Sequence, residues 1–158
     1  MSTQVDRSTT RSVRTLLDLT LEEINELSLK ISKLILEDPQ LRYLRLRSDN
    51  CCFLLAMKKA GIENAREIID EAANVLIENT IKRYGRRPPI LKEEIALWLS
   101  AWREIEQDLN LVQLSVARRL ILMRMMVRGE MWIKEVGQNI VVITNGEATY
   151  KLGNGYII

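Results

Sequence analysis

Apolar residues recur at steps of three and four over most of the chain, which is the spacing of a helix with one buried face. Thr20 and Glu23 have the spacing of a capping box and predict the start of the first helix, and Asp38-Pro39 predicts its end. Gly61 and Gly85 fit the left-handed position that closes a helix. The predicted helices cover about residues 21–37, a short stretch within 41–47, 49–61 (with Ser48 or Asp49 as its cap), 63–84, 91–109 and 112–128.

The helix predicted over residues 112–128, VQLSVARRLILMRMMVR, differs from the others because its polar side chains are scattered around the helix axis. Apolar residues fill the gaps on every side, which is typical of a helix that is buried all round. It is too short and too basic to span a membrane. Other helices or another subunit are therefore expected to cover it.

Two tryptophans four residues apart, Trp98 and Trp102, form an apolar ridge on the preceding helix. We expect them in the core rather than as a platform for nucleic-acid bases. Ile105 and Leu109 continue the same apolar face. Asn110 is expected to break this helix, so that a short turn separates it from the buried helix.

After Gly129 the period of the apolar residues changes from about 3.6 to about 2, and three short strands are predicted over residues 131–136, 139–144 and 147–152. Asn145-Gly146 predicts a two-residue hairpin turn in which both residues have a positive φ. Gly137-Gln138 is expected at the other turn. The apolar C-terminus, Tyr156–Ile158, is expected to fold back onto the domain or onto a partner.

These elements predict a mainly α protein, a helical bundle of about five helices with a small C-terminal three-stranded antiparallel β-meander. Residues 1–14 are rich in Ser, Thr and Arg without an apolar period and predict a flexible tail. Residues 15–85 form the predicted bundle and dimerisation region, and residues 86–158 add the remaining helices and the meander. One compact domain is expected, because 158 residues fit a single core.

The composition excludes several kinds of chemistry. The chain has no histidine, which removes the commonest general base and the commonest metal ligand. It also has no glycine-rich phosphate loop and no nucleophile motif. We therefore expect neither an enzyme, nor a cofactor, nor a metal site. The adjacent Cys51 and Cys52 are expected to be free thiols, and no apolar signal sequence is present, so a cytoplasmic protein is predicted.

Positive charge is concentrated in the second half of the chain. Residues 1–79 carry 11 basic and 13 acidic side chains, whereas residues 80–158 carry 12 basic and 8 acidic ones. The loop that begins with Arg86 and Arg87 contains two prolines, which prevent a helix from continuing. Such a basic loop suits phosphate groups, and it is also what an exposed helix end commonly looks like, because cations suit a helix C-terminus.

One stretch, IEQDLNLVQLSVARRLILMR at residues 105–124, resembles the helix-turn-helix of the winged-helix DNA-binding regulators. In that family an apolar residue closes the first helix and a turn residue and a second apolar residue follow. The three predicted strands resemble the wing, with Asn145-Gly146 at its tip. The residues that match the two helices and their turn are Leu109, Asn110, Leu111, Ser115, Val116 and Arg118.

The resemblance implies that the second helix enters the major groove of DNA and that the wing contacts phosphates. The basic loop adds two further candidates for phosphate contact. The candidate nucleic-acid-binding residues are Gln113, Ser115, Arg118, Arg119 and Arg124 on the helix, Lys134 and Lys151 on the wing, and Arg86 and Arg87 in the loop.

Two hypotheses remain open. The first is a dimeric, non-enzymatic DNA-binding regulator of transcription or nucleic-acid accessory protein. The second is a helical interaction subunit without nucleic-acid contact, which assembles with copies of itself or with another protein through residues 112–128 and the C-terminus. Leu114 and Ile121 bear on the choice, because a helix that faces a DNA groove should be polar where they lie.

Overall fold

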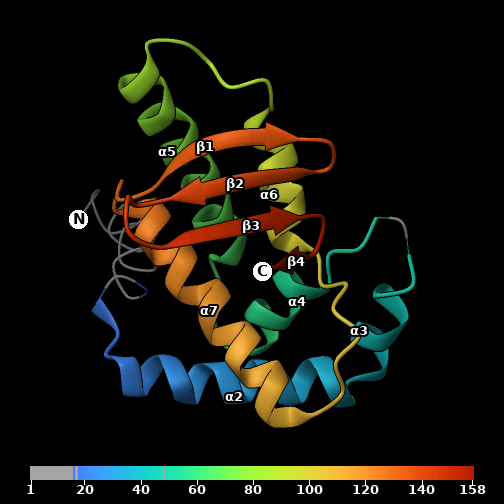
Figure 1. Cartoon of the computed structure of the whole chain (residues 1–158). Helices are drawn as coiled ribbons and strands as arrows, with labels where there is room; N and C mark the ends of the chain where they lie inside the picture. Colours follow the sequence, from blue (N-terminus) through green and yellow to red (C-terminus); the bar gives the residue numbers. More distant parts are fainter. Residues whose placement is uncertain (1–15, 17, 48) are drawn as a thin grey trace, which may run out of the picture.

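The computed structural model describes residue 16 and residues 18–47 and 49–158, so the predicted tail lies outside the described residues. The described chain is mainly helical, with one small antiparallel sheet at its C-terminal end, which confirms the predicted fold class (Figure 1). The helices are α2 (Leu21–Glu37), α3 (Pro39–Leu44), α4 (Cys52–Lys59), α5 (Ala65–Tyr84), α6 (Lys92–Ser100) and α7 (Leu109–Val127), and the strands are β1 (Trp132–Gly137), β2 (Ile140–Thr144), β3 (Thr149–Gly153) and β4 (Tyr156–Ile157).

The predicted capping box begins α2. The amide of Glu23 donates to the Thr20 hydroxyl over 3.1 Å, and the Glu23 carboxylate accepts from the Thr20 amide over 3.0 Å. Asp38 ends α2 and also caps α3, because its carboxylate accepts from the amides of Gln40 and Leu41. Pro39 follows as the first residue of α3, where a helix needs no amide hydrogen. Both predicted boundaries of α2 are therefore confirmed.

The start of α4 differs from the prediction. Asp49 does not cap this helix, and Ser48 lies outside the described residues. The helix begins at Cys52, whose amide donates to the buried side-chain oxygen of Asn50 over 2.9 Å. Asn50 takes this position because its amide group also bonds distant backbone, a long-range constraint that the local sequence does not reveal.

Helices of the same chain cover much of α7, but the helix is not buried on every side as the sequence predicted. It packs against α2 and α5, and Val116, Leu120 and Met123 are fully buried there (Figure 1). Leu114 remains exposed and Ile121 is half-buried. A partner subunit is therefore not needed to cover this helix. None of the helices in the described ranges is long and apolar enough to cross a bilayer.

The connection between α6 and α7 was predicted wrongly. Helix α6 ends at Ser100 rather than at Leu109, and residues 101–108 form an irregular segment. Asn110 does not break a helix, because it lies in the first turn of α7. The Asp108 carboxylate accepts from the amides of Asn110 and Leu111 and so starts α7 earlier than predicted. The tight turn that the winged-helix resemblance implies at 109–111 is therefore helix.

The two tryptophans of the ridge, Trp98 and Trp102, are both buried in the core, as predicted. Ile105 was expected on the same buried face, but its side chain is 91% exposed. The periodicity failed at this position because the helix had already ended and the chain continues in another direction.

The sheet has the strand order β1-β2-β3-β4, with every neighbouring pair antiparallel. Alternate residues of the first three strands, including Ile133, Val141 and Leu152, face inward and are buried. Strand β1 packs on α5, so the sheet covers one side of the bundle (Figure 1). The C-terminus folds back as expected, and it forms a fourth strand where the sequence predicted three.

The two hairpin turns depart from the predicted geometry. The β2–β3 loop spans residues 145–148, and only Gly146 has a positive φ there, of 97°. The side-chain oxygen of Asn145 instead accepts hydrogen bonds from the amides of Glu147 and Ala148. These bonds stabilise a wider loop. The β1–β2 turn lies at Gln138 and Asn139, one residue later than predicted, and Asn139 has a φ of 62°.

Candidate nucleic-acid interface

The C-terminal end of α5 fixes the position of the basic loop. Tyr84 is the last residue of the helix, and Gly85 ends it with a left-handed φ of 74°. Pro88 and Pro89 keep the following chain out of a helix, and Ile90 then anchors it in the core. Arg86 and Arg87 are thereby held on a short connection between a helix end and a buried anchor, and both are exposed.

Strand β1 is fastened to the last turns of α5. The Ile133 amide donates to the buried Thr80 hydroxyl over 2.9 Å. The side-chain amide of Asn79 donates to the carbonyls of Gly129 and Met131 over 3.0 and 2.6 Å. These bonds bring β1, an edge strand of the sheet, alongside the end of α5 that carries the basic loop.

Lys134 occupies a special position on β1. The register pairs Ile133 with Ile143 and Glu135 with Val142, so Lys134 is the extra residue of a β-bulge. A bulge bends the strand and changes the direction of a side chain, and bulges are common beside binding sites. Lys134 is exposed and lines the same hollow as the arginines of the loop.

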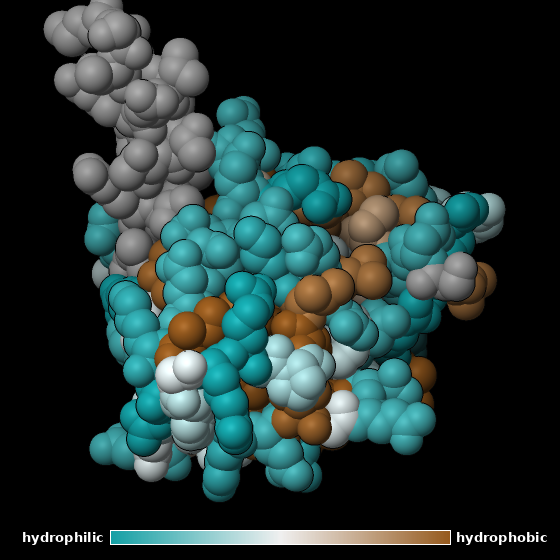
Figure 2. All heavy atoms as spheres, turned by 90° about the horizontal axis from the view of Figure 1, so that it is seen from above, coloured by the Kyte–Doolittle hydropathy of each residue, from teal (hydrophilic) through white to brown (hydrophobic). Residues whose placement is uncertain are grey.

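We call this hollow, of about 150 Å³, the α5–β1 hollow. It lies at the end of the molecule that Figure 2 shows from above, where hydrophilic side chains cover much of the surface and surround smaller apolar areas. Its lining comes from the end of α5, the basic loop and β1. The lining residues are Thr80, Tyr84, Arg86, Arg87, Pro88, Pro89, Ile133, Lys134, Glu135 and Val136.

The α5–β1 hollow is electropositive. Arg86, Arg87 and Lys134 form no ion pair with any residue in the described part of the chain, and Glu135 supplies the one carboxylate among the lining residues. Beside the hollow, the Arg83 guanidinium lies over the Trp132 ring, 3.7 Å from its centroid. Unpaired cations on a surface attract anions, and this attraction weakens with salt.

The candidate residues on α7 lie in different surroundings, since most of them are already bonded within the chain. Gln113 donates to the carbonyl of Asn25, and Arg124 donates to the carbonyl of Leu19. The Ser115 hydroxyl donates to the carboxylate of Glu104 over 2.6 Å.

Arg119 is fully buried and cannot reach a nucleic acid. Its guanidinium donates to the carbonyls of Ala101 and Gly155 and lies 4.7 Å from the centroid of Phe53 and 4.8 Å from that of Trp102. Burial lowers the pKa of Arg119 to about 10, although the carboxylate of Glu104 opposes the shift. The side chain is therefore a charged structural element of the core at neutral pH.

Among the arginines of α7 that were candidates, Arg118 alone is exposed, within the described residues. The structure thus divides the predicted set. It brings together Arg86, Arg87 and Lys134, which come from two segments 47 residues apart, and it separates them from the residues of α7. The winged-helix resemblance had grouped Lys134 with α7 and Lys151, and Tyr84 was not among the predicted candidates.

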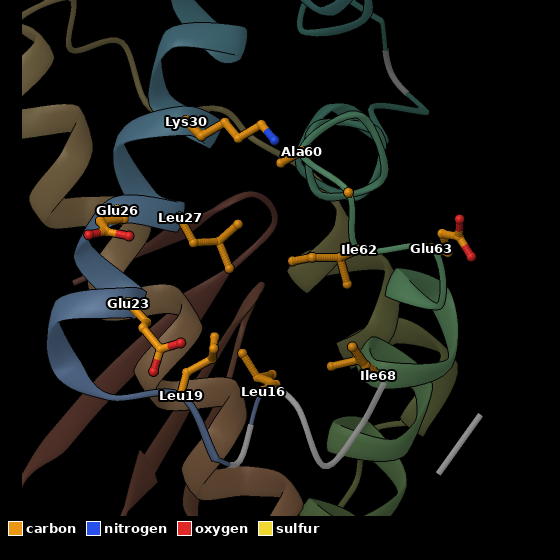
Figure 3. Close-up of a pocket in the computed structure, with 11 residues that line it drawn as sticks. Leu16, Leu19, Glu23, Glu26, Leu27, Lys30, Ala60, Ile62, Glu63 and Ile68 are labelled. Atoms are coloured by element: carbon orange, nitrogen blue, oxygen red, sulfur yellow. The ribbon is translucent and has the colours of Figure 1, made fainter. Parts of the chain in front are cut away.

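One other hollow has a different character. Figure 3 shows a cleft of about 480 Å³ in which Leu27 of α2 and Ile62 of the α4–α5 connection point toward each other, with Glu23 and Glu26 beside them. This apolar cleft with carboxylates does not suit a polyanion. Within the described ranges no group of Cys, Asp or Glu side chains could hold a metal ion.

Comparisons with known proteins do not identify a family. No family model matches the chain, and no curated protein and no solved structure matches it.

Proposed function

We propose that this protein is a non-enzymatic nucleic-acid accessory protein that binds its ligand in the α5–β1 hollow. The observation that carries the proposal is that Arg86, Arg87 and Lys134 line one hollow without an ion-pair partner among the described residues. Phosphate contacts by unpaired cations supply most of the sequence-independent affinity for nucleic acids.

The aromatic side chain in the hollow favours a single-stranded ligand. Tyr84 is 48% exposed and lies among the cations. Single-stranded nucleic acids bind where a positive groove carries aromatic rings on which bases stack. A duplex keeps its bases stacked on each other, so it can use the cations but not the ring.

The winged-helix hypothesis places the ligand on α7 instead. Gln113, Ser115 and Arg124 already bond groups of this chain, and Arg119 is buried. A recognition helix needs several free polar side chains toward base edges. We therefore favour the α5–β1 hollow over α7 as the contact surface, and a sequence-tolerant accessory role over sequence-specific regulation of transcription.

The test measures, by fluorescence anisotropy, the binding of the full chain to labelled single-stranded and duplex oligonucleotides over a series of salt concentrations. We expect salt-sensitive binding that is tighter for the single strand. The triple variant Arg86→Glu, Arg87→Glu, Lys134→Glu should weaken binding by at least about tenfold. All three side chains are exposed, so the circular dichroism spectrum should not change.

The matched control is Arg118→Glu, which reverses one exposed charge on α7. It should leave affinity close to that of the wild type. Absence of binding at low salt, or equal binding by the triple variant, would reject the proposal. Loss of binding in Arg118→Glu alone would move the contact surface to α7 and support the winged-helix hypothesis.

A further inference from the structure

A second surface is formed by the irregular segment 101–108 and by α3, which lie beside each other in Figure 1. One buried side chain joins them. The amide group of Asn50 donates to the carbonyls of Trp102 and Arg45 over 2.7 and 3.3 Å, and its oxygen accepts the Trp102 amide over 3.3 Å. Both walls of this surface are therefore held in place by the same residue.

The buried Arg119 also holds the segment. It donates to the carbonyl of Ala101, and the amide of Arg103 donates to the carbonyl of Gly155. The path of residues 101–103 is thus fixed by bonds to α7, to the C-terminal turn and to Asn50. Such a backbone cannot easily turn the following side chains inward.

This fixed backbone presents apolar side chains to solvent. Ile105 is 91% and Leu46 is 87% exposed, the highest values among the large apolar side chains of the described residues. Both line one open groove of about 680 Å³ together with Tyr43, which is 62% exposed. We call it the α3 groove. Exposed apolar side chains that line one groove are typical of a contact site for another molecule.

The charges of the α3 groove indicate its partner. Arg42 and Arg45 line it, and neither forms an ion pair within the described part of the chain. Glu104 also lines it, but its carboxylate is already engaged by Ser115 and Arg119. The groove therefore combines highly exposed apolar side chains with positive charge that no described ion pair neutralises.

We propose that the α3 groove docks an acidic segment of another protein whose apolar side chains pack on Leu46 and Ile105. The two most exposed side chains of the groove, Leu46 and Ile105, are aliphatic and, unlike Tyr43, offer no stacking surface for bases, so they favour a protein segment over a nucleic acid. Apolar contacts at the centre would supply the affinity, and carboxylates paired with Arg42 and Arg45 would orient the segment. This docking does not depend on the function of the α5–β1 hollow.

The first test uses a displayed library of random peptides selected against the full chain, with the double variant Leu46→Ser, Ile105→Ser for counter-selection. We expect recovered peptides to combine Asp or Glu with large apolar residues. A labelled synthetic copy should bind the wild type and lose affinity by about tenfold or more in the double variant. The matched control, Leu21→Ser, removes an exposed apolar side chain at the opposite end of α2 and should bind normally.

A charge exchange makes the test specific. The double variant Arg42→Glu, Arg45→Glu should have a lower affinity for the acidic peptide. It should have a higher affinity for the same peptide with Lys in place of its acidic residues. A structural role for these arginines alone would not produce this exchange. Each serine and glutamate variant changes side chains outside the buried core, so its unfolding transition should match that of the wild type.

Four results would overturn the proposal. The first is recovery of peptides without acidic residues, and the second is equal peptide binding by the wild type and the double serine variant. The third is self-association of the wild type that the double serine variant abolishes, and the fourth is loss of oligonucleotide binding by that variant. The third would assign the groove to a second copy of this chain. The fourth would assign it to nucleic acid. Unchanged oligonucleotide binding by this variant separates the result from the test of the α5–β1 hollow.

Discussion

Arg119 and the cations of the α5–β1 hollow are all positively charged, but Arg119 lies in the core and the others lie on the surface. Arg119 is fully buried, donates to two backbone carbonyls and lies 4.7 and 4.8 Å from the centroids of two stacked aromatic rings. Arg86, Arg87 and Lys134 are exposed, and none of them forms an ion pair with a described residue. The comparison shows that partners decide the role of a cation. Where backbone carbonyls and rings of the chain already contact the cation, it stabilises the fold, and where no group of the chain pairs with it, it remains available to a ligand.

The largest expected effect is on stability, at the buried site. Arg119→Met should reduce the free energy of unfolding by about 3 kcal/mol, because it removes the buried donor of the Ala101 carbonyl and leaves the Gly155 carbonyl with the Arg103 amide alone. Urea unfolding followed by circular dichroism measures this loss. The adjacent Arg118→Met, at an exposed position, should change stability by less than about 0.5 kcal/mol. Equal effects at both positions would contradict the distinction between buried and exposed cations.

The next effect concerns the aromatic ring of the hollow. Tyr84→Ala should weaken binding of a single-stranded oligonucleotide by about 1–3 kcal/mol, because it removes a stacking surface for a base. Tyr84→Phe keeps the ring and is the matched control, so its affinity should stay near that of the wild type. Duplex binding should change little in either variant. If the alanine variant weakens both ligands equally, the ring does not stack on a base.

A smaller effect tests burial beside Arg119. Burial raises the pKa of the Cys52 thiol to about 12, although the positive charges of Arg45 and Arg119 oppose the shift. In the unfolded chain the thiol ionises near its ordinary pKa, so the folded state binds the proton more tightly. The stability that the protonated Cys52 thiol contributes is therefore fully present below about pH 8.5. It decreases as the pH rises toward the pKa of the thiol in the folded state.

From pH 9 to pH 10 the free energy of unfolding of the wild type should therefore fall by about 1 kcal/mol more than that of Cys52→Ala. Urea unfolding of both proteins at several pH values isolates the contribution of the thiol, because other titrating groups are common to both. Parallel pH dependences would show that the nearby arginines, rather than burial, control the thiol.

The smallest effects are those of single cations in the hollow. Arg86→Gln, Arg87→Gln and Lys134→Gln should each reduce the slope of log affinity against log salt by about 1, with a similar loss for every oligonucleotide sequence. Lys151→Gln, on β3, removes an exposed cation of the same sheet away from the hollow and should leave the slope unchanged. A slope that falls in Lys151→Gln as well would indicate a diffuse electrostatic surface instead of a defined site.

Much of the fold could be predicted because its signals are local. The capping box at Thr20, the left-handed Gly85 and the period of the apolar residues gave the extents of α2 and α5 closely. The apolar residues on every side of residues 112–128 correctly predicted that much of α7 is buried, and the change of period after Gly129 correctly predicted the sheet. These features depend on residues within one or two helical turns of each other.

The candidate site was predictable only in part. The cluster of Arg86 and Arg87 is contiguous in the sequence, and its position at the end of α5 followed from the glycine and prolines around it. Lys134 joins these arginines only because Ile133 bonds Thr80 and because β1 contains a bulge. Neither feature can be recognised from the residues near Lys134 in the sequence. The two neighbouring arginines of α7 look alike in the sequence, yet Arg118 is exposed and Arg119 is buried.

The sequence by itself thus determined the number and approximate place of the main helices, that the C-terminal part forms an antiparallel sheet, and where positive charge gathers along the chain. The tertiary structure decided which cations are free, where α6 ends and which apolar side chains stay exposed. These outcomes depend on bonds between distant residues, such as Asn50 with Trp102 and Arg119 with Gly155. A buried polar group must find a partner wherever the fold brings one, and this requirement can override the local periodicity.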